Sequence, residues 1–85
     1  MKLRLLYFAR LRESVGCASE ELELPEHIRT VAQLRVYLSE RGGAWAEAFA
    51  SMRSIRAAIN QQMVNDQAPL QEGAEVALFP PVTGG

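Results

Sequence analysis

The sequence predicts an α+β roll, in which one main helix packs on one face of a mixed β-sheet. Three observations favour it: a strand-like alternation at the start of the chain, one amphipathic helix with clear start and stop signals, and short strand patterns after that helix. An amphipathic helix must bury its apolar stripe, so we expect the strands to form a single sheet beneath it. The 85 residues suffice for one domain, expected at residues 1–79, with an extended tail at residues 80–85.

The first two elements are expected to be strands of one hairpin. Residues Lys2 to Phe8 alternate with the period of a half-buried strand. The predicted core face consists of Leu3, Leu5 and Tyr7. A second strand is expected from Glu20 to Leu24, and Pro25 ends it because proline cannot donate a backbone hydrogen bond. The polar residues between these strands predict a long loop.

The main helix is expected to begin at Val31 and to stop at Gly42-Gly43. Thr30 and Gln33 form the capping-box pattern, in which each side chain accepts a hydrogen bond from a free backbone N–H at the helix start. Apolar residues then recur at helical spacing on one stripe, and a glycine after the last of them is the usual C-terminal stop. The stripe consists of Val31, Leu34 and Leu38.

Shorter elements follow the main helix. A second helix is expected from Ala44 to Ala50, with Trp45 and Phe49 turned toward the core. Three strands come next, and they are expected at Arg56 to Asn60, Gln62 to Val64, and Glu75 to Phe79. This order of elements favours a β-grasp, in which the first and last strands lie side by side and parallel.

Composition excludes several classes of function. Nine basic and ten acidic side chains, with no long run of one sign, leave no basic footprint, so we expect no nucleic-acid partner. No stretch approaches the ~18 apolar residues of a membrane span. Lys2 and Arg4 interrupt the first apolar stretch, so we expect no signal peptide and no membrane partner. A single cysteine allows no internal disulfide, which favours the reducing cytoplasm.

The sequence offers few groups that could perform catalysis. It lacks a phosphate-binding glycine-rich loop, a cluster of metal ligands and a nucleophile–base pair. His27 is the only histidine, and without a second ligand nearby it is not expected to bind metal. Cys17 has no basic neighbour in the sequence that would activate its thiol. We therefore expect no metal and no permanently bound cofactor, and we assign neither residue a role.

The C-terminal tail is the segment with a clear chemical use. Pro80 and Pro81 cannot donate backbone hydrogen bonds, so we expect the tail to leave the sheet in an extended form. Six extended residues reach at most about 20 Å, far enough to enter the active site of another protein. The threading segment consists of Pro80, Pro81, Val82, Thr83 and Gly84. Glycines at the end let the backbone pass a narrow channel, whereas the plainer alternative is a frayed terminus.

The reactive group of this tail is expected to be the carboxylate of Gly85. A carboxylate is a poor electrophile. Adenylation by a separate enzyme that uses ATP would turn it into an acyl donor, which sulfur could capture as a thiocarboxylate. No side chain of this protein need be catalytic in that scheme.

A second candidate site is the sheet face that points away from the main helix. If the first and last strands are neighbours, Phe8 and Phe79 share that face, with Met63 nearby. Exposed aromatic side chains beside a functional tail would mark a surface that binds a partner. The alternative is that Phe8 and Phe79 merely cover each other.

Three stretches of the sequence carry a resemblance to a known family: YFARLRE near the start, AINQQMV in the middle and EGAEVALFPPVTGG at the end. Together they resemble the small subunits of molybdopterin synthase, which are sulfur carriers with a ubiquitin-like β-grasp fold. The resemblance spans nearly the whole chain. Its most specific part is FPPVTGG, since Gly-Gly alone is shared with ubiquitin and with the sulfur carrier of the thiamine pathway.

This resemblance implies a function and a set of partners. A ubiquitin-activating-type enzyme would use ATP to adenylate Gly85, and a sulfur donor would convert the adenylate to a thiocarboxylate. The large subunit of molybdopterin synthase would receive the tail, and Gly84 would permit the backbone to thread into it. Cyclic pyranopterin monophosphate would then gain the sulfurs of the molybdopterin dithiolene. A heterotetramer of two small and two large subunits would follow, because each tail delivers one sulfur, and the docking residues would be Phe8, Met63 and Phe79.

Two alternatives remain open from the sequence. The first keeps the carrier class but changes the pathway: sulfur delivery for thiamine synthesis or tRNA thiolation, or attachment to lysines as a ubiquitin-like modifier. The second is a non-catalytic interaction module whose tail stays unmodified. The large protein that co-purifies would distinguish the pathways, and the mass of the intact chain would reveal an exchange of oxygen for sulfur.

Overall fold

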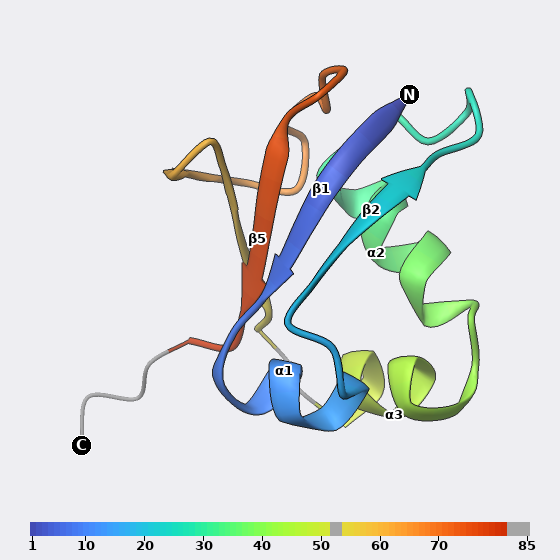
Figure 1. Cartoon of the computed structure of the whole chain (residues 1–85), viewed down its shortest axis with the longest axis vertical. Helices are drawn as coiled ribbons and strands as arrows, with labels where there is room; N and C mark the ends of the chain where they lie inside the picture. Colours follow the sequence, from blue (N-terminus) through green and yellow to red (C-terminus); the bar gives the residue numbers. More distant parts are fainter. Residues whose placement is uncertain (52–53, 82–85) are drawn as a thin grey trace.

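The computed structural model describes residues 1–51 and 54–81, which form a five-stranded mixed sheet with three helices packed around it (Figure 1). The strands are β1 (Lys2–Tyr7), β2 (Ser19–Glu23), β3 (Arg56–Ile59), β4 (Gln62–Val64) and β5 (Glu75–Phe79). The helices are α1 (Ala9–Val15), α2 (Val31–Ser39) and α3 (Gly43–Ser51). The predicted α+β class and β-grasp architecture are confirmed.

The first and last strands are neighbours in the middle of the sheet. The strand order is β2-β1-β5-β3-β4, and β1 pairs with β5 in parallel while the other pairs are antiparallel. This confirms the predicted adjacency of the two strands. Both run toward the end of the sheet where α1 and α3 lie, so the chain leaves β5 at that end (Figure 1).

The core lies between the sheet and the helices. Alternate residues of β1 and β5 and the apolar stripe of α2 are almost fully buried, as the two periodicities predict. These residues are Leu3, Leu5, Tyr7, Val31, Leu34, Leu38, Val76 and Leu78. Each large apolar side chain buried in this way contributes roughly 1.5–3 kcal/mol, so this layer holds α2 against the strands.

Helix α2 starts at the predicted capping box. The backbone N–H of Gln33 donates to Thr30 Oγ1 at 3.2 Å, and the backbone N–H of Thr30 donates to Gln33 Oε1 at 3.1 Å. After the helix the chain turns through Gly42 and Gly43, both with positive φ. Helix α2 itself already ends at Ser39, with Glu40 as its right-handed C-cap, so the predicted stop at Gly42-Gly43 lies too late, and the two glycines instead turn the chain into α3.

The long loop expected between the first two strands is instead helix α1, so that prediction was wrong. Leu11 is its fully buried side chain, and Val15, one turn later, packs partly against the core. Gly16 ends the helix in the left-handed conformation and donates its N–H to the Arg12 carbonyl at 2.9 Å. A helix of seven residues is too short to be stable alone, so burial of Leu11 holds it in place.

Helix α3 confirms the second helix that the sequence predicts, although with nine residues it is as long as α2 and not shorter. Trp45 and Phe49 are only partly buried against the core, and Ala48 is the residue that α3 buries most. The ring of Trp45 meets that of Tyr7 edge to face, with centroids 5.2 Å apart. Trp45 therefore joins α3 to the end of β1, while the helix itself packs against α1 and α2.

Candidate functional site

The sheet face that points away from α2 carries a continuous row of apolar side chains. Leu6 of β1 lies beside Ala77 of β5 in the strand register. Ala77 is opposite Ala58 of β3, which is opposite Met63 of β4. Residues directly opposite in neighbouring strands point to the same side of a sheet, so these four form one row, here called the apolar band. Met63 is 57% exposed at its end.

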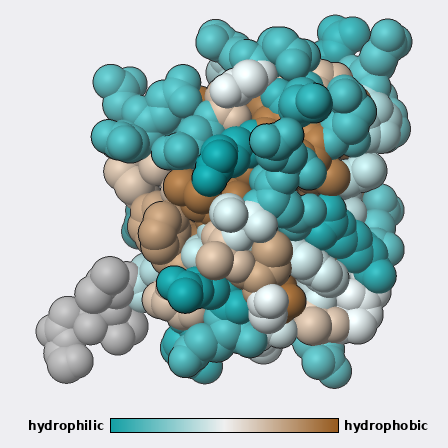
Figure 2. Space-filling model, viewed as in Figure 1, coloured by the Kyte–Doolittle hydropathy of each residue, from teal (hydrophilic) through white to brown (hydrophobic). Residues whose placement is uncertain are grey.

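Phe8 and Phe79 extend the apolar band toward the end of the sheet where the chain leaves β5. Each follows the pair Leu6 and Ala77 by two residues, and the Phe8 N–H donates to the Leu78 carbonyl at 3.2 Å. Phe8 is 46% exposed and Phe79 is partly exposed. The structure thus brings Phe8 and Phe79 together and places Met63 on the same face. In Figure 2, brown and tan apolar residues gather in the middle of the view, with hydrophilic residues above them.

The predicted tail starts directly beside these aromatic residues. Strand β5 ends at Phe79, and Pro80 and Pro81 are partly exposed and belong to no strand. Val82, Thr83, Gly84 and Gly85 lie outside the described residues. The reactive carboxylate and the threading role of the tail therefore stay predictions, whereas the surface around the start of the tail is defined.

A polar cluster behind this end of the sheet was missed by the sequence analysis. The Tyr7 hydroxyl donates to Glu20 Oε2 at 2.8 Å, and Arg41 donates to both oxygens of that carboxylate at 2.9 and 3.0 Å. Arg41 also lies 4.5 Å from the centroid of the Trp45 ring. The four residues come from β1, β2, α3 and the turn before α3. No local pattern predicts such contacts, because they form only when these distant segments fold together.

The charges of this cluster support one another. Burial favours a higher pKa for Glu20, but the hydrogen bonds from Arg41 and Tyr7 outweigh it and hold the pKa of Glu20 below its usual value. Burial and the adjacent carboxylate raise the pKa of Tyr7. The cluster therefore holds an ionised Glu20 between two donors and fixes the end of β1, from which Phe8 and α1 follow.

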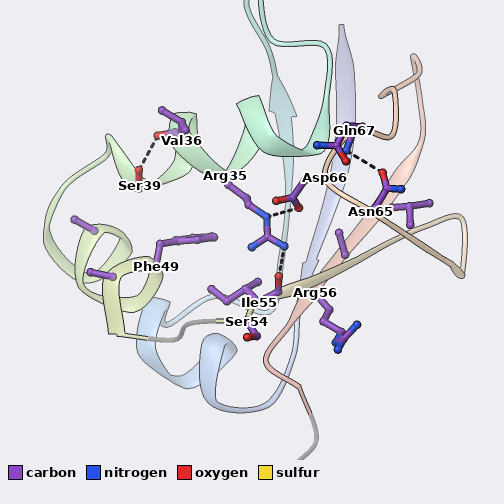
Figure 3. A pocket seen from close by; sticks show the side chains of 14 residues that line it. Arg35, Val36, Ser39, Phe49, Ser54, Ile55, Arg56, Asn65, Asp66 and Gln67 are labelled. Atoms are coloured by element: carbon purple, nitrogen blue, oxygen red, sulfur yellow. Dashed lines mark hydrogen bonds and ion pairs between the residues drawn. The ribbon is translucent and has the colours of Figure 1, made fainter.

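An open groove of about 990 Å³ lies between α2, α3 and the β3–β4 hairpin (Figure 3). Arg35 crosses its wall: its Nε donates to Asp66 Oδ1 at 2.9 Å, and its Nη2 donates to the Ile55 carbonyl. These contacts tie α2 to the strand side of the groove. Because Arg35 is already paired with Asp66 and the Ile55 carbonyl, it is not free to bind a ligand in the groove, and we assign the groove a structural role.

The two isolated candidates for chemistry remain isolated in the fold. His27 is exposed, and the Cys17 thiol donates to the Ser19 carbonyl at 3.1 Å. Across residues 1–51 and 54–81, no three side chains of the metal-binding types come together. Nor does any helix in these ranges have the length and apolar content to cross a bilayer. The apolar band, Phe8 and Phe79 are thus the main candidate site that the structure describes.

Comparison with known proteins gives consistent matches. The ThiS family model matches residues 5–85. The molybdopterin synthase sulfur carrier subunit of Escherichia coli is 40% identical, over 98% of this chain and 99% of that relative. A putative molybdopterin converting factor subunit 1 from Pyrococcus furiosus superposes with a TM-score of 0.78 at 32% identity, covering 96% of this chain and 99% of that one. A complex of subunits 1 and 2 of the molybdopterin-converting factor from Helicobacter pylori contains a chain with the same fold, with a TM-score of 0.67 at 22% identity over 100% of both chains.

Proposed function

Because this chain belongs to the ThiS family, we propose that it is the sulfur carrier subunit of a molybdopterin synthase. The observation that carries the proposal is its 40% identity to a sulfur carrier subunit of that name over almost the full length of both chains. The start of the tail beside an apolar surface supports the same function. A carrier needs a surface that docks and a terminus that reaches the reacting molecule, and it needs no active site of its own.

The chemistry takes place at Gly85. A separate adenylating enzyme of the ubiquitin-activating type binds ATP and transfers AMP to the carboxylate. A sulfur donor then attacks the acyl carbon and displaces AMP, which leaves a thiocarboxylate. Cyclic pyranopterin monophosphate accepts one sulfur from each of two loaded carriers and so gains the two sulfurs of the molybdopterin dithiolene, while water returns each Gly85 to a carboxylate. The carrier itself binds no permanent cofactor, and its single cysteine favours action in the cytoplasm.

The protein on which this chain docks is the large subunit of the synthase. The complex of subunits 1 and 2 from Helicobacter pylori supports a pairing of this kind. We place the contact at the apolar band, with Phe8, Phe79 and Met63 as its anchors, because large apolar side chains that are exposed in the free protein gain most from being covered. Six extended residues then span up to about 20 Å into the partner. Two small subunits on a dimer of large subunits supply the two sulfurs.

The mass of the intact chain tests this function. The protein is incubated with the adenylating enzyme from the same host, ATP and a sulfur source, and a control omits ATP. We expect the mass shift of one oxygen exchanged for sulfur, located at the C-terminal residue and absent from the control. A chain that stays unmodified with its own adenylating enzyme would instead support an interaction module with a plain tail.

A further inference from the structure

The face that carries the apolar band has an uneven distribution of charge. At the end far from the tail, Arg4 of β1 lies in register between Glu21 of β2 and Glu75 of β5. Opposite charges directly across a sheet stabilise one another, so these two carboxylates offset the charge of Arg4, although neither lies within ion-pair distance of it. At the tail end, the strands place one charged residue on this face, Arg56 of β3, directly opposite Phe79 in the register.

Arg56 has no counter-charge within the part of the chain that the structure describes. Its side chain is exposed and points away from the Arg35–Asp66 pair (Figure 3). The ion pairs of residues 1–51 and 54–81 are made by the amino terminus, Arg35 and Arg41. Nor does the Arg56 guanidinium lie over Phe79, since the cation–π contact among these residues is that of Arg41 with Trp45. Arg56 is therefore available to a partner.

Docking at Phe79 would remove water from the neighbourhood of Arg56. A guanidinium that loses water without gaining a counter-charge opposes binding, whereas a carboxylate placed beside it favours binding and rejects other surfaces. The counter-charge is therefore sought on the partner, because the described residues place no carboxylate in an ion pair with Arg56.

We propose that Arg56 is a specificity contact, which pairs with an acidic side chain at the rim of the tail-receiving channel of the large subunit. This inference rests on the proposed function, and it adds the chemistry of the partner surface: an apolar patch for Phe79 bordered by a carboxylate for Arg56. A charge at the rim of an interface acts mainly on the association rate and on its dependence on salt. Phe79 supplies affinity in this arrangement, and Arg56 selects the partner.

The test measures binding of Arg56 variants to the purified large subunit by stopped-flow and calorimetric titration. At low ionic strength we expect Arg56→Gln to weaken binding about 3- to 10-fold, and Arg56→Glu to weaken it by about 30-fold or more. Both losses should shrink at ~0.5 M salt, where charges are screened beyond a few ångströms. Arg56→Lys should keep most of the affinity. The matched control is Arg4→Gln, on the same face but between two carboxylates, which should bind within about twofold of the wild type.

Two results would overturn the inference. One is an Arg56→Glu variant that is folded by circular dichroism and binds as tightly as the wild type. The other is a loss of affinity that is equal at low and high salt, since this would indicate lost packing of the arginine stem. Reversing acidic residues one at a time at the rim of the large subunit should restore binding of Arg56→Glu at one position, and restoration at none also counts against the pair. Failure of the proposed function looks different, because the wild-type chain would then neither bind the large subunit nor carry sulfur.

Discussion

The Tyr7 hydroxyl donates a 2.8 Å hydrogen bond to Glu20 Oε2, and this contact joins the end of β1 to β2. Arg41 holds the same carboxylate through two hydrogen bonds. Phe8 follows Tyr7 directly, so the residue that begins the candidate docking surface is anchored through its neighbour. The Glu20 carboxylate thus connects the stability of this end of the fold to the position of a functional side chain.

Acid is expected to weaken the fold at Glu20. Its pKa in the folded protein lies below the ordinary value of 4.5, since the bonds from Arg41 and Tyr7 outweigh the effect of burial. A lowered pKa stabilises the folded state above the unfolded-state pKa, and this stabilisation is lost as the pH falls through the folded-state pKa. Glu20→Gln should therefore reduce the free energy of unfolding by about 1–3 kcal/mol near neutral pH and by less at pH values below about 4.

Urea unfolding at several pH values measures this effect. Glu47→Gln is the matched control, because Glu47 is exposed on α3 and makes no ion pair within the described residues. Its unfolding free energy should stay within about 0.5 kcal/mol of the wild type at every pH. If Glu20→Gln cost the same at pH 3 as at pH 7, the ionised carboxylate would not be the source of the stabilisation.

Truncation of Leu11 tests why α1 forms at all. The side chain is fully buried, and a cavity left by Leu→Ala in a core costs about 2–5 kcal/mol. We expect Leu11→Ala to lower the free energy of unfolding by this amount, and therefore to lower the urea concentration at the midpoint of unfolding. Val36→Ala on α2 is the control, because Val36 is 57% exposed and its truncation should cost no more than about 0.5 kcal/mol. Equal midpoints for the two variants would mean that α1 is stabilised by something other than Leu11.

Local signals in the sequence were sufficient for most of the fold. The capping box at Thr30 and the alternation of β1 each depend on residues within one element, and the structure has both. Helix α1 has only a short local pattern, Leu11 and Val15 one turn apart before Gly16, and it depends on burial against other elements. The contact of Tyr7 with Glu20 joins two strands, so no local pattern indicates it. The turn of the β3–β4 hairpin was also not predicted. Asn60 and Gln61 both adopt a positive φ there, a conformation that these two residue types seldom adopt elsewhere.

The candidate site divides in the same way. Phe8 and Phe79 could be predicted as neighbours because parallel pairing of the first and last strands fixes their register, and the terminal glycines form a motif that is visible in the sequence. Arg56 could not be recognised, because an arginine in a strand is ordinary until the register places it opposite Phe79. The role proposed for Arg56 follows from its position opposite Phe79 and from the absence of an ion-pair partner among the described residues.

A charge at Phe79 should separate docking from folding. Phe79→Asp removes the aromatic anchor and places a carboxylate against the apolar partner surface, and this carboxylate would also pair with Arg56, which lies opposite position 79 in the register. We expect binding to the large subunit to weaken by about 100-fold or more, in the range seen for anchor residues at interfaces. Val36→Asp is the control, because Val36 is exposed on α2, away from the apolar band, and should bind normally. A titration in which both variants match the wild type would remove the apolar band as the docking site.

The position of the reactive carboxylate sets the last prediction. One residue added after Gly85 moves the terminal carboxylate about 3.5 Å, and a displacement of even ~1 Å at a reacting centre can cost on the order of a hundredfold in rate. Sulfur loading by the adenylating enzyme should collapse in this variant and in one that lacks Gly85, while circular dichroism stays unchanged. Gly84→Val should also slow loading, because its branched side chain crowds a channel that must close around bare backbone. The Arg4→Gln variant should load at the wild-type rate.

Intact mass shows whether the added residue was removed first. An untrimmed, folded variant that still loads at the wild-type rate would contradict the carrier mechanism.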